Sequence, residues 1–190
     1  MQKFLVRLLT FCVLLAASLW ITSLALEPTP FDGGVKPDTA PGGGALVQVY
    51  GADVVGLRGH FAIHTWVATR ARGADEFRIY EVIGWRLRRG RPAVRISEGD
   101  PDRNWFGSPA VLLQEVRGAA AEPLIGRIEA AVASYPFPNE YRMWPGPNSN
   151  SFTEWIALEV PELGLDLPAK AIGQSWMRSE YPDIRPGGGT

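Results

Sequence analysis

The fold predicted for this chain rests mainly on residues 60–85, HFAIHTWVATRARGADEFRIYEVIGW. Two runs rich in β-branched and aromatic residues, 60–68 and 76–85, flank the polar segment ARGAD. Such runs, divided by Gly and Asp, are typical of antiparallel strands joined by a hairpin. If Arg72 and Gly73 form the centre of a tight turn, His64 lies directly opposite Glu81 on one face of the sheet.

This pairing makes His64 and Glu81 candidate catalytic residues. Directly opposite residues have Cβ atoms about 5 Å apart, so a carboxylate can accept from one imidazole nitrogen and fix the tautomer of the ring. A base and its orienting group form half of a catalytic triad. Two alternatives stay open: a slip of one residue separates the pair, and a His–Glu pair across a sheet also serves as a structural hydrogen bond.

On either side of this hairpin, the runs 45–52 and 93–97 also read as strands, whereas 111–118 reads as either a strand or the approach to a helix. Glu122-Pro123 opens a helix with apolar residues at three-and-four spacing, which Pro136 ends. A second helix starts near Ser151 and ends at Pro161. The predicted class is α+β: a curled antiparallel sheet with helices packed on one side.

The segment WPGPNSNSF, residues 144–152, gathers small polar side chains at the mouth of the second helix. A side chain in the first helical turn meets unsatisfied backbone N–H groups and the positive end of the helix dipole. That setting favours a nucleophile and supplies an oxyanion hole. Capping is the alternative: Ser151 with Glu154 fits the S-x-x-E capping box, and Ser149 or Asn150 could cap one turn earlier. Ser149 has no capping box of its own, so it is the candidate nucleophile.

The order of these parts resembles the circularly permuted papain-like fold of NlpC-type peptidoglycan hydrolases and lecithin:retinol acyltransferase relatives. In those families the helix opens with an Asn-Cys-x-His-Phe type motif, which Asn148, Ser149 and Phe152 match here, with Ser151 where His often stands. His64 matches the strand histidine, and Glu81 matches the polar residue of the next strand. The sequence departs from the pattern at the nucleophile, where serine replaces cysteine.

The resemblance implies amide or ester hydrolysis, or acyl transfer, with Ser149 as nucleophile, His64 as base and Glu81 as orienting group. Asn148 and backbone N–H groups near Ser149 would stabilise the oxyanion. A serine hydroxyl is a much weaker acid than a thiol and needs a well-placed base. Two outcomes therefore stay open: an activated serine, or a catalytically inactive cleft that binds cell-wall or lipid fragments.

Four segments are also similar to the bacterial family called domain of unknown function 3750: FAIHTWVA, YEVIGW, WPGPNSNSFTEWIA and VPELGLDLPAKAIG. Together they extend over most of residues 45–174. This second resemblance indicates kinship and implies no established activity.

Several tryptophans lie near the candidate site in the sequence. Trp66 shares a sheet face with His64, and Trp144 precedes the Ser149 turn. We expect Trp66 and Trp144, together with Asn150, to bind the substrate by stacking, apolar contact and hydrogen bonding. Trp85 and Trp155 read as strand core and helix core.

Composition excludes several classes of function. The formal net charge is −1, so nothing global indicates a nucleic-acid partner. An arginine cluster between Arg86 and Arg95 suits anionic head groups or cell-wall phosphates, or is simply a solvated hairpin tip.

The single cysteine, Cys12, excludes an intramolecular disulfide and a cysteine zinc site. His60 and His64 would lie about 13 Å apart on a strand, so we predict no metal and no cofactor.

The N-terminus predicts a membrane segment. Residues Leu8 to Leu26 are uncharged and as a helix would span roughly 28 Å. Lys3 and Arg7 precede this run, so the positive-inside rule places the remainder of the chain on the periplasmic side of a bacterial inner membrane. A signal peptide cut after Ala25 is the alternative, and it also exports the domain. The predicted divisions are an anchor or signal peptide 1–26, a Pro/Gly-rich linker 27–44, one domain 45–184 and a Gly-rich tail 185–190.

Overall fold

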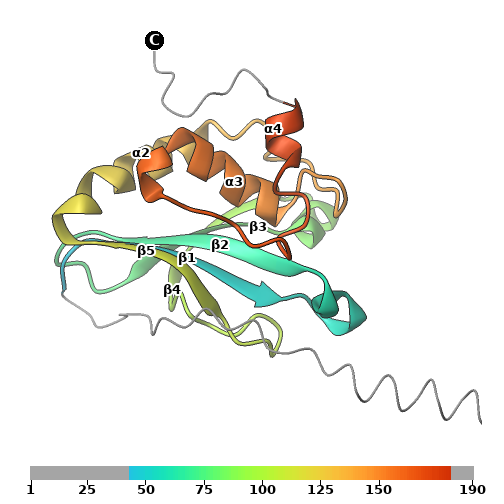
Figure 1. Cartoon of the computed structure of the whole chain (residues 1–190), viewed down its shortest axis with the longest axis horizontal. Coiled ribbons are helices and arrows are strands. Elements are labelled where there is room, and N and C mark those ends of the chain that lie inside the picture. Colours follow the sequence, from blue (N-terminus) through green and yellow to red (C-terminus); the bar gives the residue numbers. More distant parts are fainter. Residues whose placement is uncertain (1–42, 181–190) are drawn as a thin grey trace, which may run out of the picture. The chain divides into compact units, whose positions relative to one another are not determined.

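One antiparallel sheet organises the computed structural model, which describes residues 43–180 (Figure 1). Its strand order is β4-β3-β2-β1-β5. The strands are β1 Leu46–Asp53, β2 Ile63–Arg70, β3 Phe77–Val82, β4 Val94–Gly99 and β5 Val111–Arg117. Residues 111–118, for which the sequence allowed either a strand or the approach to a helix, contain the edge strand β5. The α+β class with an antiparallel sheet is confirmed.

The register between β2 and β3 differs from the prediction by two residues. Val67 pairs with Tyr80 and Thr69 with Arg78, which centres the turn on Gly73 and Ala74. The predicted direct opposition of His64 and Glu81 is therefore wrong. Because side chains alternate with a period of two, a shift of two residues keeps both on one face as diagonal neighbours.

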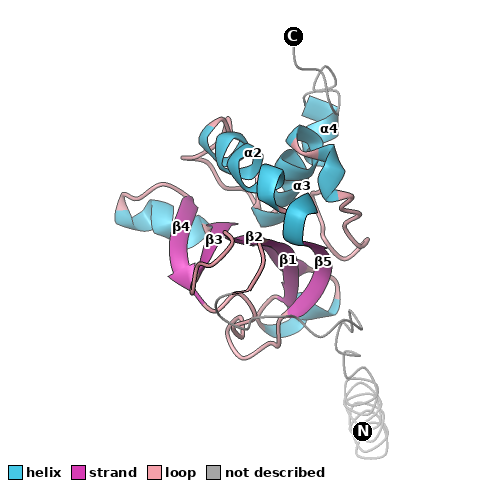
Figure 2. Ribbon diagram, turned by 90° about the vertical axis from the view of Figure 1, so that its left-hand side faces the viewer, coloured by secondary structure: helices cyan, strands magenta, loops and turns pink. Residues whose placement is uncertain are grey.

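Two helices, α2 Glu122–Ala133 and α3 Ser149–Glu159, cover one face of the sheet (Figures 1 and 2). The core between these layers is apolar and includes Val47, Val67 and Val82 from the strands with Ile128 and Ile156 from the helices. A short helix, α4 Trp176–Glu180, follows near the end of the described chain and was missed by the sequence analysis.

The first turn of α3 differs from the predicted one. The helix begins at Ser149 with Asn148 as its N-cap, and Ser151 completes the capping box from the third helical position. The predicted box of Ser151 with Glu154 is wrong, because Asn148 can satisfy two orphan N–H groups one turn earlier. Glu154 instead forms an ion pair with Arg178 of α4.

A segment of the chain covers the other face of the sheet. Strands β4 and β5 are opposite edges, so the connection between them must cross four strand spacings of about 4.8 Å each. Residues 100–110 make this crossing and place Trp105 against an apolar cluster that includes Tyr50, Trp66 and Ile79. Both faces of the sheet are therefore buried, which explains why His64 and Glu81 lie in the interior rather than in solvent.

Short 3-10 helices connect the main elements: η1 Gly56–His60, η2 Gly84–Arg89, η3 Gly118–Ala120 and η4 Pro161–Leu163. The run 76–85 was predicted as one strand, but β3 ends at Val82 and η2 takes over at Gly84. Trp85 is consequently 42% exposed, and its assignment to a strand core is wrong. Trp155 is buried, as expected for a helix core residue.

The predicted membrane segment 8–26, most of the linker 27–44 and the tail 185–190 lie outside the described residues. Within residues 43–180, no helix combines the length and the apolar character needed to cross a bilayer. The described residues belong to one compact unit.

Candidate functional site

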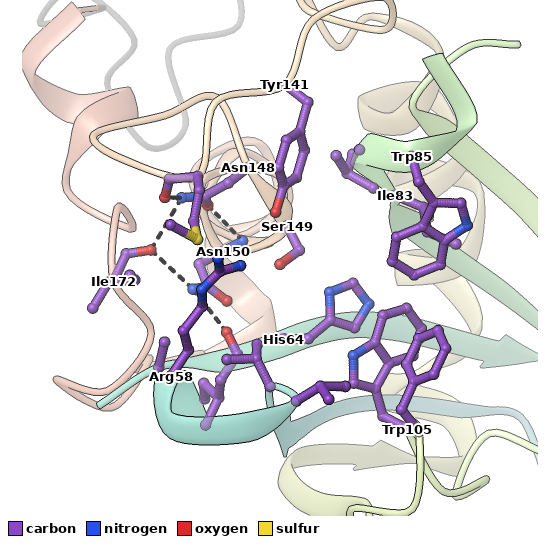
Figure 3. Close-up of a pocket in the computed structure, with 18 of the residues that line it drawn as sticks. Arg58, His64, Ile83, Trp85, Trp105, Tyr141, Asn148, Ser149, Asn150 and Ile172 are labelled. Atoms are coloured by element: carbon purple, nitrogen blue, oxygen red, sulfur yellow. Dashed lines mark hydrogen bonds between the residues drawn. The ribbon is translucent and has the colours of Figure 1, made fainter. Parts of the chain in front are cut away.

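A cavity of about 700 Å³ lies where the start of β2, the N-terminus of α3, η1 and η2 meet (Figure 3). Four of the residues singled out by the sequence line it: His64, Asn148, Ser149 and Asn150. Glu81 is fully buried beside His64 and is outside the cavity lining. The fold thus brings the candidate nucleophile and the candidate base to one cavity.

The side chain of Asn148 has a structural task. Its Oδ1 accepts from the backbone N–H groups of Asn150 at 2.9 Å and Ser151 at 3.0 Å. Its Nδ2 donates to the carbonyl oxygens of Met143 at 3.0 Å and Ile172 at 3.2 Å. With every polar atom of the amide occupied, Asn148 fixes the start of α3, and its predicted role toward an oxyanion gains no support from this arrangement.

Asn150 joins α3 to the first residues of β2. Its Nδ2 donates to the carbonyl oxygens of Ile63 at 3.1 Å and Ile172 at 2.9 Å. Its Oδ1 accepts from the hydroxyl of Thr65 at 3.0 Å. These bonds are buried, so they hold the helix terminus against the strand that carries His64. Its predicted role in binding substrate stays a prediction.

Ser149 differs from its three polar neighbours. Its hydroxyl and its backbone N–H have no hydrogen-bond partner among the described residues, whereas the side chains of Asn148, Asn150 and Ser151 each have at least one. Figure 3 shows the Ser149 side chain projecting into the cavity that His64 also faces. Both residues are described, and no hydrogen bond joins Ser149 to His64. As the first residue of α3, Ser149 presents a free N–H at the positive end of the helix.

The predicted contact between His64 and Glu81 is present. His64 Nε2 lies 3.2 Å from Glu81 Oε2, and both side chains are buried. An ionised carboxylate only accepts hydrogen bonds, so Nε2 must carry the ring proton and Nδ1 the lone pair. Nδ1 has no partner within residues 43–180, which leaves it available as a base.

Two arginines add to the effect of His64 in keeping Glu81 ionised. Arg103 donates to Glu81 Oε1 at 2.7 Å, and Arg95 lies 3.5 Å from the same oxygen. Burial would raise the pKa of Glu81, but the hydrogen bond with His64 and the two guanidinium charges outweigh that effect and lower the pKa below its ordinary value. A charged residue of the crossing segment therefore supports the orienting group.

Burial also acts on His64. Desolvation lowers the pKa of His64 below its ordinary value and outweighs the opposing hydrogen bond to Glu81. The ring stacks on Trp105 with centroids 3.7 Å apart and an interplanar angle of 13°. His64 is consequently a neutral, rigidly held imidazole at neutral pH, the state that a general base requires.

Tyr141 is a cavity residue that sequence reasoning missed. Its ring fits against Gly84, where an added Cβ would lie 2.4 Å from a ring carbon. Figure 3 shows the Tyr141 hydroxyl on the side of the cavity that holds Ser149. Desolvation raises the pKa of Tyr141, against the smaller effect of Arg58, so the phenol stays protonated and can donate a hydrogen bond. The feature that marks Tyr141 is its contact with Gly84, 57 residues earlier, and a single sequence does not reveal such a contact.

The aromatic wall of the cavity is not the predicted one. Trp66 is fully buried behind His64, and its indole N–H donates to the carbonyl oxygen of Pro101 at 2.8 Å. Trp144 is 68% exposed and lies outside the cavity lining. Trp85 and Trp105 line the cavity in their place (Figure 3). Substrate contacts of Trp66 and Trp144 stay predictions without support from their positions.

Comparison with protein families identifies the kin of this chain. A family model described as protein of unknown function (DUF3750) matches residues 44–176. The chain belongs to that family. The DUF3750 match covers all five strands, both long helices and every residue of the candidate site. Neither the curated proteins nor the solved structures contain a match to the chain. The resemblance to permuted papain-like hydrolases has no such support and stays a hypothesis.

Proposed function

We propose that this DUF3750 protein is a serine-dependent acyl hydrolase or acyltransferase that acts on an amide or ester. The observation that carries the proposal is the position of Ser149. It has the one hydroxyl at the start of α3 without a structural partner in the described chain, and it projects into the cavity that His64, the partner of Glu81, also lines (Figure 3). The predicted export of the chain makes the substrate an amide or ester of the cell envelope.

The first step is attack of Ser149 Oγ on the carbonyl carbon of the substrate, with transfer of the hydroxyl proton to His64 Nδ1. The developing oxyanion accepts hydrogen bonds from the Ser149 backbone N–H and the Tyr141 hydroxyl. When the tetrahedral intermediate collapses, the bond to the leaving alcohol or amine breaks and His64 returns the proton to that group. The product of this step is an acyl ester on Ser149.

The second step is release of the acyl group. Water, or the hydroxyl of an acceptor molecule, gives its proton to His64 Nδ1 and attacks the acyl ester, which restores the Ser149 hydroxyl. Glu81 stabilises the imidazolium formed in both steps through its bond to Nε2. Arg103 and Arg95 keep Glu81 ionised throughout, so it orients the ring and does not take up the proton.

A second candidate function is a binding module that holds a cell-wall or lipid fragment without chemistry. The lack of a hydrogen bond between Ser149 and His64 in the described structure favours it. Catalytic hydrogen bonds in free enzymes are often formed only in the complex with substrate, so this lack is compatible with both candidates. The two candidates differ in one observable, the reactivity of Ser149.

Labelling with a fluorophosphonate probe tests the reactivity of serine directly. We expect the full chain to be labelled, and we expect Ser149→Ala and His64→Ala to abolish labelling. Ser151→Ala is the matched control, because its hydroxyl lies two residues away and is used in the capping box. Labelling that persists in Ser149→Ala, or a folded wild-type protein that is not labelled at all, contradicts the proposal and favours the binding module.

A further inference from the structure

Most of the exposed apolar side chains of the described chain either line the cavity or lie next in sequence to a residue that lines it. Nine large apolar residues are exposed within residues 43–180, and five of these line the cavity. Three more are sequence neighbours of lining residues, which leaves only Ile96 of β4 elsewhere. We call the segments that carry these eight residues, 55–61, 84–91, 105–107 and 141–144, the rim. The most exposed of them are Val55, Leu57, Phe61, Phe106 and Trp144.

The exposure of the rim is built into the fold. Leu57 is 81% exposed at the tip of η1, and Phe106 is 64% exposed. Phe106 is also the one described non-glycine residue with a positive φ, at 48°. A bulky residue rarely adopts this left-handed conformation, so the backbone is strained at a residue whose ring packs against Trp85 and Trp105 and is still largely exposed.

The rim is also strongly basic. It contains no Asp or Glu and six arginines, although basic and acidic residues nearly balance over the whole chain. None of the six forms an ion pair with a described residue, whereas seven arginines elsewhere in the described chain pair with a carboxylate. The rim arginines are Arg58, Arg86, Arg88, Arg89, Arg91 and Arg142.

We propose that the rim docks onto the surface of an anionic lipid bilayer, so that the cavity opens toward the membrane. Arginines without a carboxylate partner are attracted to anionic head groups, and Trp and Phe side chains favour the interface between head groups and acyl chains. A single-stranded nucleic acid would also match arginines and aromatic rings. The aliphatic residues Val55 and Leu57 favour the bilayer. Their side chains are stabilised by burial among acyl chains, and they have no aromatic ring that could stack on a nucleobase.

A fluorescent probe on the rim tests this docking with the full chain. Cys12 is the single cysteine, so a Cys12→Ser background allows an environment-sensitive fluorophore to be attached at Leu57→Cys. Asp75→Cys is the matched control, because Asp75 is exposed in the β2–β3 turn at the opposite end of β2. Both proteins are reconstituted in vesicles of phosphatidylcholine alone and in vesicles that also contain phosphatidylglycerol. Any contribution of residues 1–42 is then the same at both positions.

We expect the probe at position 57 to shift to the blue, and to be quenched by brominated lipid, only when phosphatidylglycerol is present. The probe at position 75 should not respond, and added salt should reverse the response by screening. The double variant Arg89→Glu/Arg91→Glu should lower the docking equilibrium constant, measured from the blue-shifted fraction at a fixed phosphatidylglycerol content, about tenfold or more. Because docking requires no reaction at Ser149, Ser149→Ala should give the same shift with phosphatidylglycerol vesicles as the unsubstituted residue.

Three results would overturn the proposal. The probes at positions 57 and 75 could respond alike, the position-57 probe could ignore phosphatidylglycerol, or a single-stranded oligonucleotide could shift that probe while anionic vesicles do not. The last result would assign the rim to nucleic acid.

Discussion

At the scale of single residues, His64 has the property with the clearest consequence in solution. Burial lowers the pKa of His64 in the folded state. Near pH 6.5 the unfolded chain therefore takes up a proton at His64 while the folded chain stays unprotonated there. The free energy of unfolding should therefore fall as the pH drops below about 6.5, by up to about 1.4 kcal/mol per pH unit. Urea denaturation between about pH 7.5 and pH 5, where Glu81 stays ionised, measures this slope.

The chain offers a matched control for this prediction. His60 is the other histidine of the sequence and is exposed. We expect His64→Gln to flatten the pH dependence in this range and His60→Gln to leave it in place. An equal slope in wild type and His64→Gln would show that another group is responsible.

Tyr141 carries a prediction about catalysis. If its hydroxyl donates to the oxyanion, Tyr141→Phe should lower kcat for a p-nitrophenyl ester about 100-fold, the usual cost of one lost oxyanion donor. The ring is kept, so packing against Gly84 and the midpoint of thermal unfolding should change little. An unchanged kcat would remove Tyr141 from the mechanism.

Single residues also show what the sequence can and cannot predict. His64, Glu81 and Ser149 were found because their residue types and places on strands and a helix terminus indicate chemistry. Arg103 and Trp105, which support the pair, belong to a segment without periodicity, and their contacts exist only because that segment crosses the sheet. A register error of two residues left the His64–Glu81 contact intact, whereas an error of one would have removed it.

At the level of secondary-structure elements, two serines in the first turn of α3 have different roles: Ser151 caps the helix and Ser149 is the proposed nucleophile. The Ser151 hydroxyl accepts from the Asn148 backbone N–H at 2.8 Å, and that of Ser149 has no partner in the described chain. Ser151→Ala should lower the free energy of unfolding by about 1 kcal/mol, the usual value of a helix cap. Ser149→Ala should change it by less than about 0.5 kcal/mol. Urea denaturation of the two variants makes the comparison.

The outcome that contradicts this assignment is a Ser149→Ala variant as destabilised as Ser151→Ala, because Ser149 would then be structural. The sequence placed the start of this helix within two residues, near Ser151 instead of Ser149, from an apolar periodic run that ends before Pro161. It favoured Ser151 over Asn148 as the cap because both residue types accept from backbone N–H groups and Ser151 is followed by a glutamate three residues later.

At the scale of the whole molecule, the candidate site depends on both layers that cover the sheet. One layer, α3, supplies Ser149, and the other, residues 100–110, holds the His64–Glu81 pair in place. The helical layer was predictable from its periodicity, whereas the crossing follows from the strand order, which puts β4 and β5 at opposite edges. Nothing in the sequence of residues 100–110 indicates that task.

Trp66→Phe tests how the crossing segment is held. The substitution keeps a ring but removes the N–H that donates to Pro101 at 2.8 Å. We expect hydrogen exchange of residues 101–108 to accelerate and the free energy of unfolding to fall by about 1 kcal/mol. Trp155→Phe loses a comparable bond to Ala131 on the helical side and should leave exchange in that segment unchanged. Equal exchange in both variants would contradict the role given to Trp66.

A cysteine at position 149 reports whether the fold places that position beside a base and a helix terminus. In the full chain with Cys12→Ser, Ser149→Cys provides one thiol whose rate of alkylation by iodoacetamide can be followed against pH. We expect a thiol pKa well below the ordinary value of about 8.5, which returns toward that value when His64→Ala is added. A thiol at position 149 that titrates at or above about 8.5, with or without His64, would show that the fold does not activate this position.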